Sequence, residues 1–420
     1  MHGRRRAALL VVILLVAVGV RIAAGLVETG VTGPDAGRYH GSAVRLLEGR
    51  GFGTTYSPPA YSLLIAMVYE LLGRGNALGV RVAQAVVWGI TIFFIFQIAR
   101  RVYSDEVGLI AAGIAALYLP FIRFGGYAGS AYYGSENLSI CLSLAALLIL
   151  LGRGVGPIRA GVAGVVIGLA TLTRAGFFLF PLVMAAWLWT VGGTRPVWKL
   201  TVGLMVLVGA AVALGPWIYR NYERFGDVVP VATSLGDTFL GGNSPYARGF
   251  SETASGYPEY QWISALYPGQ DEWSEHPRNR LFLAEGLSFL RENLLTVAPW
   301  LVLRKLYLFI AGFGQTYNLS YVLVLPFALA GLVLSRENPG AWLLGGMVAY
   351  HAALAVLLHP MDGRMRLAIE PLLVVFAAYG AWCLRTRLRS WAFGGLIGVW
   401  SGLNLYVALH WGWIREVVRG

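Results

Sequence analysis

Long apolar runs separated by short polar stretches recur along the whole sequence. Eleven runs carry few charges, and they cover residues 7–27, 77–98, 107–124, 138–151, 160–172, 175–189, 200–219, 321–334, 341–358, 367–384 and 391–413. A helix needs about 20 apolar residues to cross a hydrocarbon core of about 30 Å. The runs are continuous rather than alternating, which disfavours a β-barrel. The pattern predicts an all-α polytopic membrane protein with about eleven transmembrane helices, in a range of about ten to thirteen.

Two further apolar stretches, 59–72 and 294–310, are ambiguous. If both lie along the interface, the basic clusters between the runs all fall on the cytoplasmic side, as the positive-inside rule demands. These clusters are Arg4–Arg6, Arg100/Arg101, "GRGVGPIR", "GGTRPVWK", "SRENPG" and "RTRLRS". If only 59–72 crosses, the middle clusters move outside. Both stretches are therefore predicted to be juxtamembrane helices on the outer surface.

This topology gives one transmembrane domain, 1–420, with no separate soluble domain. Its outer face receives a first loop, 28–76, and a large loop with an interfacial helix, 220–318. The first run is also compatible with a signal peptide. It continues to residue 27, longer than a typical signal core, which favours an uncleaved anchor. Either way, Asp35 lies on the far side of the membrane.

Composition narrows the class further. Hydrophobic residues make up 57% of the 420 residues and charged residues 13%, which excludes an ordinary soluble domain. The net charge of +12 resides in short clusters that read as topology determinants, so no nucleic-acid partner is expected. The two cysteines, Cys141 and Cys383, lie inside apolar runs and predict no disulfide framework.

Two acids stand at the outer ends of apolar runs. Asp35 follows the first run, and Glu136 in "AYYGSENLSI" opens the fourth. Each has a structural alternative, because Asp35 suits a helix N-cap and Glu136 suits the positive end of a helix dipole. If folding brings the two carboxylates together at one membrane face, the pair suits acid–base chemistry.

Several cations are also predicted on the outer side, against the positive-inside trend. They are Arg174 in "TLTRAGFFLFP", Arg364 and Arg366 in "HPMDGRMRLAIEP", and Arg304 and Lys305 on the second interfacial helix. Arginine binds phosphate bidentately, so this group suits a phosphate at headgroup depth. For Arg304 and Lys305 the alternative is snorkelling toward lipid headgroups.

The sequence indicates no metal or cofactor site. His351 and His359 are eight residues apart, but no ligand partner at helical spacing accompanies them, so polar side chains within the bundle are expected. The sequence contains no Walker, dinucleotide or metalloprotease motif. No acid cluster with ligand spacing surrounds Asp35. We therefore expect a metal-independent protein without a cofactor.

Four segments carry a resemblance to a known family. They are "PDAGRYHGSAVRLLEGRGF" followed by "PPAYSLLIAMVYELLGRGNALGVRVAQ", "TLTRAGFFLFP", "GPWIYRNYERFGDVVPVATSLGDTFLGGNSPYARG" and "DGRMRLAIEPLLVVFAAYG". In order and spacing the chain resembles the polyprenyl-phosphate-sugar-dependent glycosyltransferases of the GT-C fold. The similar branch holds the protein O-mannosyltransferases, the aminoarabinose transferases and the RgtA/B/C/D-like bacterial enzymes. The resemblance covers most of the chain, although each motif alone is degenerate.

The resemblance implies a GT-C-type bundle and a catalytic role for Asp35. That residue would act as general base while an acceptor hydroxyl displaces a polyprenyl phosphate from a sugar, with inversion, on the outer face of a bacterial or archaeal cell membrane. Glu136 matches a second acid, and the leaving phosphate would be held by Arg174, Arg364, Arg366, Arg304 and Lys305. The implied substrate-binding residues are Tyr39, Tyr61, Arg220, Asn221 and Asn243.

The implied partners are a polyprenyl-phosphate sugar, membrane lipids, and a lipid, polysaccharide or protein acceptor. Many relatives have two adjacent acids in the first loop, whereas here Asp35 is followed by Ala36. This departure weakens an assignment as a protein O-mannosyltransferase proper. The main rival is a transporter or flippase of a lipid-linked or envelope substrate, which would show paired repeats and ionisable residues at mid-membrane depth. A non-catalytic scaffold is a third alternative.

Overall fold

The computed structural model describes residues 2–27, 35–122, 134–152, 154–191, 195–247, 263, 265–311, 318–361 and 363–414. The regular elements in these ranges are helices. They are α1 (His2–Leu26), α2 (Ala36–Leu47), α3 (Ala60–Leu72), α4 (Ala77–Val102), α5 (Asp105–Leu117), α6 (Leu119–Ile122), α7 (Glu136–Leu150), α8 (Pro157–Thr173), η1 (Ala175–Phe177), α9 (Phe180–Val191), α10 (Pro196–Phe225), α11 (Leu235–Gly242), η2 (Gln270–Glu272), α13 (Glu275–Glu292), α14 (Ala298–Ala311), α15 (Leu319–Leu334), α16 (Pro339–Leu358), η3 (Gly363–Arg366), α17 (Glu370–Arg387) and α18 (Ser390–Leu409).

The apolar runs account for the membrane helices. Each of the eleven runs overlaps one of the helices α1, α4, α5, α7, α8, α9, α10, α15, α16, α17 and α18, in this order. Run 107–124 continues past α5 into α6, and run 175–189 begins in η1. Within the described ranges, five helices are long and apolar enough by themselves to cross a membrane, namely α1, α4, α10, α16 and α18. The all-α membrane fold is confirmed. The number of crossings stays a prediction, because the other helices are shorter or more charged.

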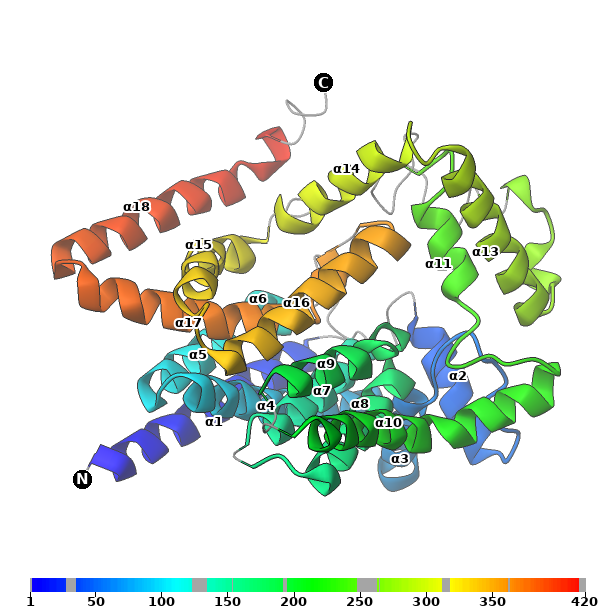
Figure 1. Ribbon diagram of the computed structural model, residues 1–420, viewed down its shortest axis with the longest axis horizontal. Coiled ribbons are helices and arrows are strands. Elements are labelled where there is room, and N and C mark those ends of the chain that lie inside the picture. The colour runs from blue at the N-terminus through cyan, green and yellow to red at the C-terminus, as the bar shows by residue number, and fades with distance from the viewer. Residues whose placement is uncertain are drawn as a thin grey trace.

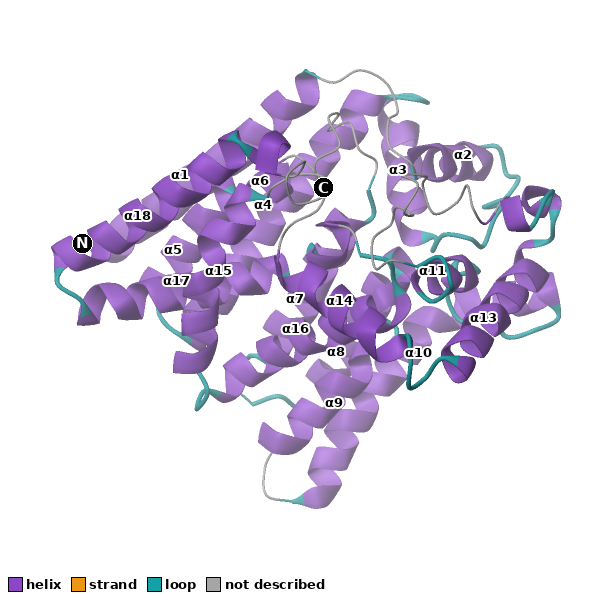
Figure 2. Ribbon diagram, turned by 90° about the horizontal axis from the view of Figure 1, so that it is seen from above, coloured by secondary structure: helices purple, strands orange, loops and turns teal. Residues whose placement is uncertain are grey.

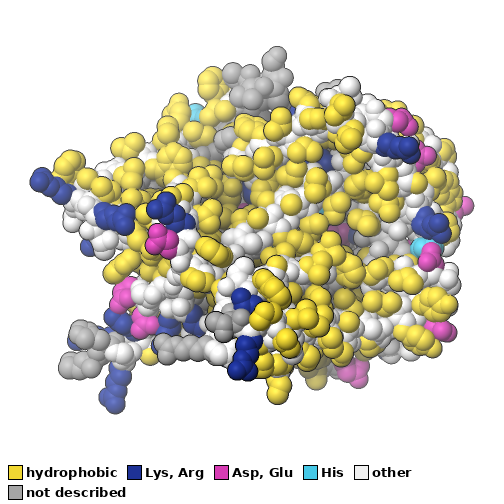
Figure 3. All heavy atoms as spheres, viewed as in Figure 1, with side chains coloured by type: hydrophobic (Ala, Val, Ile, Leu, Met, Phe, Trp, Pro, Cys, Tyr) yellow, Lys and Arg dark blue, Asp and Glu magenta, His cyan; other side chains and the backbone are white. Residues whose placement is uncertain are grey.

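The elements divide between two ends of the molecule (Figures 1 and 2). Helices α2, α3, α11 and α13 gather at one end, whereas the N-terminus and the α17–α18 junction lie at the other. Hydrophobic side chains cover most of the face shown in Figure 3, and Lys and Arg gather toward the end that carries the N-terminus. A basic end of this kind is the arrangement that the positive-inside rule describes.

Glycine allows the closest helix contacts in the bundle. A Cβ atom on Gly164 of α8 would lie 2.1 Å from the carbonyl oxygen of Val206 on α10. A Cβ atom on Gly331 of α15 would lie 1.9 Å from the carbonyl oxygen of Phe376 on α17. Small residues let membrane helices approach until their backbones touch, and dispersion contacts then stabilise the pair. At these two positions a larger residue would separate α8 from α10 and α15 from α17.

The first loop is tied to the large loop. The carboxylate of Glu275, the first residue of α13, accepts hydrogen bonds from Thr54 Oγ1 at 2.6 Å and from the Thr55 amide at 2.8 Å. Arg224 near the end of α10 donates to the Gly53 carbonyl at 3.1 Å. Residues far apart in the sequence therefore hold the first loop, and with it α2, against the end of α10 and the start of α13.

The two predicted juxtamembrane stretches are helices. The first, 59–72, is α3, and the second, 294–310, becomes regular only at Ala298 in α14, because residues 293–297 form turns. Their placement at the membrane surface stays a prediction. Residues 248–262, 264 and 312–317 of the large loop, which include parts of "GGNSPYARGF" and "YQWISALYPGQDEW", lie outside the described residues.

Candidate active site

Asp35 precedes α2 but does not cap it with its side chain. Its backbone carbonyl accepts from the Tyr39 amide at 3.2 Å, while its carboxylate makes no capping hydrogen bond. Instead, Oδ1 pairs with Arg38, one turn along α2, and Oδ2 accepts from Arg364 Nη2 at 2.8 Å. The capping alternative for this side chain is therefore wrong. The carboxylate faces another part of the bundle.

Glu136, the first residue of α7, is held by two arginines. Its side chain is only 4% exposed, and its Oε1 accepts from Arg174 Nη1 at 2.5 Å and from Arg364 Nη2 at 2.9 Å. Two guanidinium groups at this distance stabilise the ionised carboxylate. The other oxygen, Oε2, is buried and has no hydrogen-bond partner among the described residues. Arg364 thus bridges the two acids.

Each member of this cluster stands where a helix begins or ends. Arg174 is the residue after α8, with an extended backbone (φ −150°), and η1 follows it directly. Arg364 belongs to the short 3₁₀-helix η3 between α16 and α17. We call Asp35, Glu136, Arg174 and Arg364 the acid–arginine cluster. Its four side chains come from four segments distributed over the whole sequence.

Tyr39 and Tyr61 lie beside the cluster. The Tyr39 hydroxyl donates to Oγ of Ser135, the residue before Glu136, at 3.1 Å. The Tyr61 ring packs edge-on against the Tyr39 ring, with centroids 4.9 Å apart. Burial raises the pKa of Tyr39 above its usual value of 10, and the charges of Asp35 and Glu136 add to the shift. Tyr39 therefore keeps its hydroxyl proton at neutral pH.

Sequence reasoning missed two members of this environment. Arg38 pairs with Asp35 across an i,i+3 spacing, and this spacing on an expected helix was a usable signal. Ser135 accepts a hydrogen bond from Tyr39, which lies 96 positions earlier in the sequence, and no local sequence pattern predicts that contact.

Arg366 lies apart from the cluster, although it was predicted to act with Arg364. Its side chain is buried and donates to the Phe309 carbonyl at 3.0 Å. Its Nε lies 3.8 Å from Glu370 Oε1, and its guanidinium stands 4.2 Å from the centre of the Tyr321 ring. In a 3₁₀-helix, side chains two residues apart point about 120° apart around the axis, so the two arginines face different surroundings.

Lys305 is buried rather than snorkelling. It is 1% exposed and donates to Asn243 Oδ1 at 3.2 Å, so the headgroup alternative is wrong for this residue. Asn243 in turn donates to the Leu357 carbonyl at 3.0 Å, at the end of α16. The guanidinium of Arg304 stands 5.0 Å from the centre of the Trp300 ring.

His359, directly after α16, lies near Lys305 and near Arg174 and Arg364 of the acid–arginine cluster. Burial lowers the pKa of His359 to about 3, and the nearby charges of Arg174, Lys305 and Arg364 lower it further. Three cations from three different segments, Arg174, Lys305 and Arg364, therefore lie near one neutral imidazole.

Arg220 and Asn221, near the end of α10, anchor the first loop. Arg220 Nη1 donates to Thr55 Oγ1 at 2.5 Å and to Asn221 Oδ1 at 2.9 Å, and its guanidinium stands 4.6 Å from the centre of the Trp217 ring. Asn221 is fully buried and donates to the Val229 carbonyl at 2.9 Å. These contacts link the end of α10 to Thr55 in the first loop and to Val229 in the segment that follows the helix. Both residues therefore help to hold the first loop in position.

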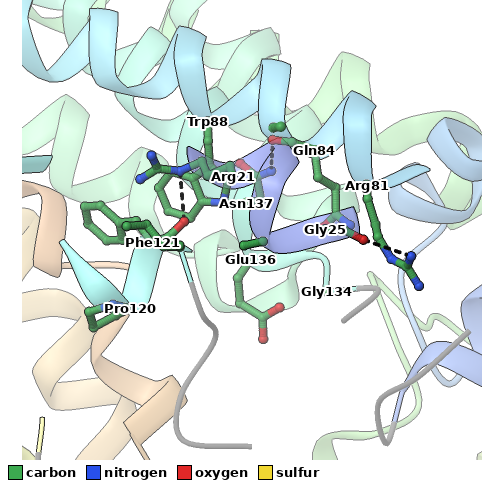
Figure 4. A pocket seen from close by; sticks show the side chains of 13 residues that line it. Arg21, Gly25, Arg81, Gln84, Trp88, Pro120, Phe121, Gly134, Glu136 and Asn137 are labelled. Atoms are coloured by element: carbon green, nitrogen blue, oxygen red, sulfur yellow. Dashed lines mark hydrogen bonds between the residues drawn. The ribbon is translucent and has the colours of Figure 1, made fainter. Parts of the chain in front are cut away.

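A small cavity of about 70 Å³ borders Glu136 between α1, α4, α6 and α7 (Figure 4). Arg21 in its wall donates to four backbone carbonyls, those of Ala17, Ala115, Ala116 and Phe121, at 2.8–3.2 Å. Asn137 donates to the Gln84 carbonyl at 2.8 Å, and the Glu136 carboxylate points away from both side chains. The cavity wall thus fixes the start of α7 and turns Glu136 toward Arg174 and Arg364.

The described residues hold no group of three or more His, Cys, Asp or Glu side chains arranged to bind a metal ion. The cluster instead combines two carboxylates with two arginines. Such a set can accept a proton and bind an oxyanion.

Comparison with known proteins agrees with the family resemblance. Residues 56–219 match the family model described as dolichyl-phosphate-mannose-protein mannosyltransferase. The undecaprenyl phosphate-alpha-4-amino-4-deoxy-L-arabinose arabinosyl transferase 2 of Pseudomonas fluorescens is 33% identical over 235 residues, which are 51% of this chain and 38% of that protein. Transferase 1 of another strain is 28% identical over 174 residues, 40% of this chain and 30% of that protein. The chain thus matches less than two fifths of the length of these curated relatives.

Solved structures show the fold. ArnT from Cupriavidus metallidurans bound to undecaprenyl phosphate has a TM-score of 0.58 at 17% identity, covering 93% of this chain and 62% of that chain. The apo oligosaccharyltransferase of Archaeoglobus fulgidus has a TM-score of 0.58 at 14% identity, covering 96% and 54%. The archaeal oligosaccharyltransferase AglB from Archaeoglobus fulgidus, in complex with an inhibitory peptide and a dolichol-phosphate, gives 0.55 at 14% identity, covering 97% and 54%. The GT-C-type fold and the predicted resemblance to polyprenyl-phosphate-sugar glycosyltransferases are confirmed.

Proposed function

We propose that this chain is a membrane glycosyltransferase that moves a sugar from a polyprenyl-phosphate donor to an acceptor hydroxyl, with inversion. The observation that carries the proposal is the bridge that Arg364 makes between Asp35, at 2.8 Å, and Glu136, at 2.9 Å. A candidate base and candidate phosphate-binding cations lie within one cluster. A displacement at an anomeric carbon needs both functions side by side.

Asp35 is the proposed general base. It takes the proton of the acceptor hydroxyl while the acceptor oxygen attacks the anomeric carbon, and the bond from that carbon to the phosphate oxygen breaks. Both Asp35 oxygens are paired with arginines, and the acceptor hydroxyl is proposed to displace one of these partners when it binds. Arg38 is the more accessible partner, with its side chain 39% exposed against 17% for Arg364. We therefore assign the exchange to Arg38.

Arg174 and Arg364 are the proposed phosphate-binding residues. The departing polyprenyl phosphate gains negative charge, and donors fixed before the reaction stabilise that charge without reorganising. Glu136 holds the two arginines in place, because its Oε1 pairs with both guanidinium groups. Lys305 adds a third cation through its position near His359. The proposed step uses no metal ion.

The comparisons support the donor class. The curated relatives carry undecaprenyl phosphate in their names, and the two similar solved structures contain undecaprenyl phosphate and dolichol-phosphate. We extend this class to the present chain. The acceptor is a lipid, polysaccharide or protein hydroxyl, and Ala36 in place of a second acid argues against protein O-mannosylation. We place the site on the outer face of a bacterial or archaeal membrane, opposite the basic loops.

A direct test uses purified wild type and Asp35→Asn in detergent. Co-purifying lipids are identified by mass spectrometry, candidate polyprenyl-phosphate sugars are added, and release of free polyprenyl phosphate is followed. Release by wild type alone, with lipid bound to both proteins, supports base catalysis. Equal release by both proteins removes Asp35 from the mechanism. Binding of no polyprenyl lipid by either protein contradicts the donor class and brings the transporter alternative forward.

A further inference from the structure

A second, larger cavity lies at the end of the bundle away from Asp35. Its volume is about 430 Å³, within the range of roughly 300–1,000 Å³ typical of small-molecule sites. The ends of α4, α7, α9, α10 and α16 form its wall. Helix α7 starts at Glu136 and ends at this cavity, and α16 starts at the cavity and ends next to His359. The two sites thus stand at opposite ends of the same helices.

Four of the predicted cytoplasmic loops converge on this cavity. Its wall includes Arg101, Gly152 and Gly154 of "GRGVGPIR", Lys199 of "GGTRPVWK", and Asn338 of "SRENPG". These segments are separated by long stretches of sequence, and only the packing of the helices brings them together. The predicted topology places the cavity at the headgroup level of the cytoplasmic leaflet.

The described wall carries two cations and no acid. Arg101 uses one of its five N–H donors, in a 2.6 Å hydrogen bond to the Leu148 carbonyl at the end of α7. Lys199 lies 5.9 Å from the centre of the Trp189 ring, and its ammonium group makes no hydrogen bond to the described residues. The nearby acid Glu337 points to solvent, with its side chain 90% exposed. The wall therefore offers donors to an anion.

Two tryptophans complete the wall. Trp187 donates through Nε1 to the Pro339 carbonyl at 2.7 Å, which fixes its ring against the start of α16. Trp198 is 46% exposed at the start of α10. Tryptophan favours the membrane–water interface because one side of its ring contacts hydrocarbon and the other contacts headgroups. The wall thus offers an apolar surface beside two cations.

We propose that this cavity binds the phosphodiester headgroup of an anionic phospholipid, with Arg101 and Lys199 on the phosphate and the tryptophans against the glycerol and acyl region. Basic pockets between membrane helices on the cytoplasmic side suit such headgroups. The inference depends on the predicted topology and is independent of the glycosyl-transfer proposal.

The test measures thermal unfolding of the purified full chain in a neutral detergent. Phosphatidylglycerol, phosphatidylcholine or inorganic phosphate is added to wild type, to Lys199→Gln and to Arg101→Gln/Lys199→Gln. The matched control is Arg385→Gln/Arg387→Gln, which removes two exposed cations from the last turn of α17, outside the cavity wall. Native mass spectrometry counts the retained phosphatidylglycerol on each protein.

Phosphatidylglycerol is expected to raise the melting temperature of wild type and the control more than phosphatidylcholine does. The cavity variants should bind it at least roughly tenfold more weakly. An unchanged response in Lys199→Gln and the double variant overturns the site. A full response to inorganic phosphate overturns the lipid as occupant. If the double variant fails to fold, Lys199→Gln decides alone, because it removes no hydrogen bond within the described chain.

Discussion

Arg364 Nη2 lies 2.8 Å from Asp35 Oδ2, although the two residues are 329 positions apart in the sequence. The contact joins η3, in the last seventh of the chain, to the first residue of the first loop that the structure describes. It places a cation suited to phosphate against the acid suited to proton transfer. The proposed mechanism depends on this one relationship more than on any single residue.

Replacing Asp35 by Asn should abolish most of the activity. The amide cannot accept the acceptor proton, and loss of a general base typically lowers the rate by about 10²–10⁴-fold. Release of polyprenyl phosphate under saturating donor measures the effect. Glu48→Gln is the control, since this acid also lies at an end of α2 but pairs with Arg50, away from the cluster. Near wild-type release by Asp35→Asn would contradict the assignment.

Replacing Arg364 by Gln should lower kcat/KM by about 10²–10³-fold, the cost expected when one fixed donor to a developing oxyanion is lost. Because the donor phosphate also loses a binding partner, less polyprenyl lipid should co-purify. Arg291→Gln on α13, an exposed cation, should leave both quantities unchanged. If Arg364→Gln changes neither, Arg364 only holds the fold together.

Arg366 should matter for stability rather than for phosphate binding. Arg366→Met leaves Glu370, which is fully buried, without its ion partner at 3.8 Å. Breaking a buried pair from one side costs about 3–5 kcal/mol in the free energy of unfolding. Thermal unfolding measures the loss, and Arg366→Met/Glu370→Leu should recover most of it. A single variant as stable as wild type would show that the pair contributes nothing.

The Tyr39 hydroxyl should make stability fall at alkaline pH. Because the pKa of Tyr39 is raised in the folded protein, the unfolded chain releases this proton first, near pH 10. The contribution is therefore complete below pH 10 and is lost as the pH rises toward the folded pKa. Tyr39→Phe removes it, so the stability gap between wild type and variant should narrow between pH 8 and 11. A constant gap across that range would contradict the burial of a neutral hydroxyl.

Chelation should leave the transfer reaction intact, since the proposed step uses only protein groups. Activity of wild type is compared before and after dialysis against EDTA, then after re-addition of Mg²⁺, Mn²⁺ or Zn²⁺. Full activity without added metal agrees with the proposal. Loss that one divalent ion restores would require a metal site and a different source of phosphate stabilisation.

The helices could be predicted well because the bilayer imposes a local rule. A segment in hydrocarbon must satisfy its own backbone hydrogen bonds, so each long apolar run becomes a helix. The residues at which the helices begin and end were harder to predict, as the turns at residues 293–297 before α14 show. End positions depend on capping and on neighbours, and composition alone does not encode them.

The candidate site could be predicted only in part. Asp35, Glu136, Arg174 and Arg364 were each recognisable because an acid or an arginine in a loop predicted on the outer side departs from the usual membrane pattern. The choice of Arg364 over Arg366 was not recognisable, because it depends on which way η3 faces. The burial of Lys305 was likewise hidden, because it depends on Asn243, 62 positions away.

By itself, the sequence determined that this is a helical membrane protein with unusual polar residues between particular helices. Those properties follow from the hydrophobicity of short segments, which needs no knowledge of distant ones. Only the tertiary structure decided that two acids and two arginines meet at one end, and that four basic loops surround a cavity at the other. The physical reason is that these contacts join residues far apart in the sequence, so they form only when the helices pack against one another, as they do closely at Gly164 and Gly331.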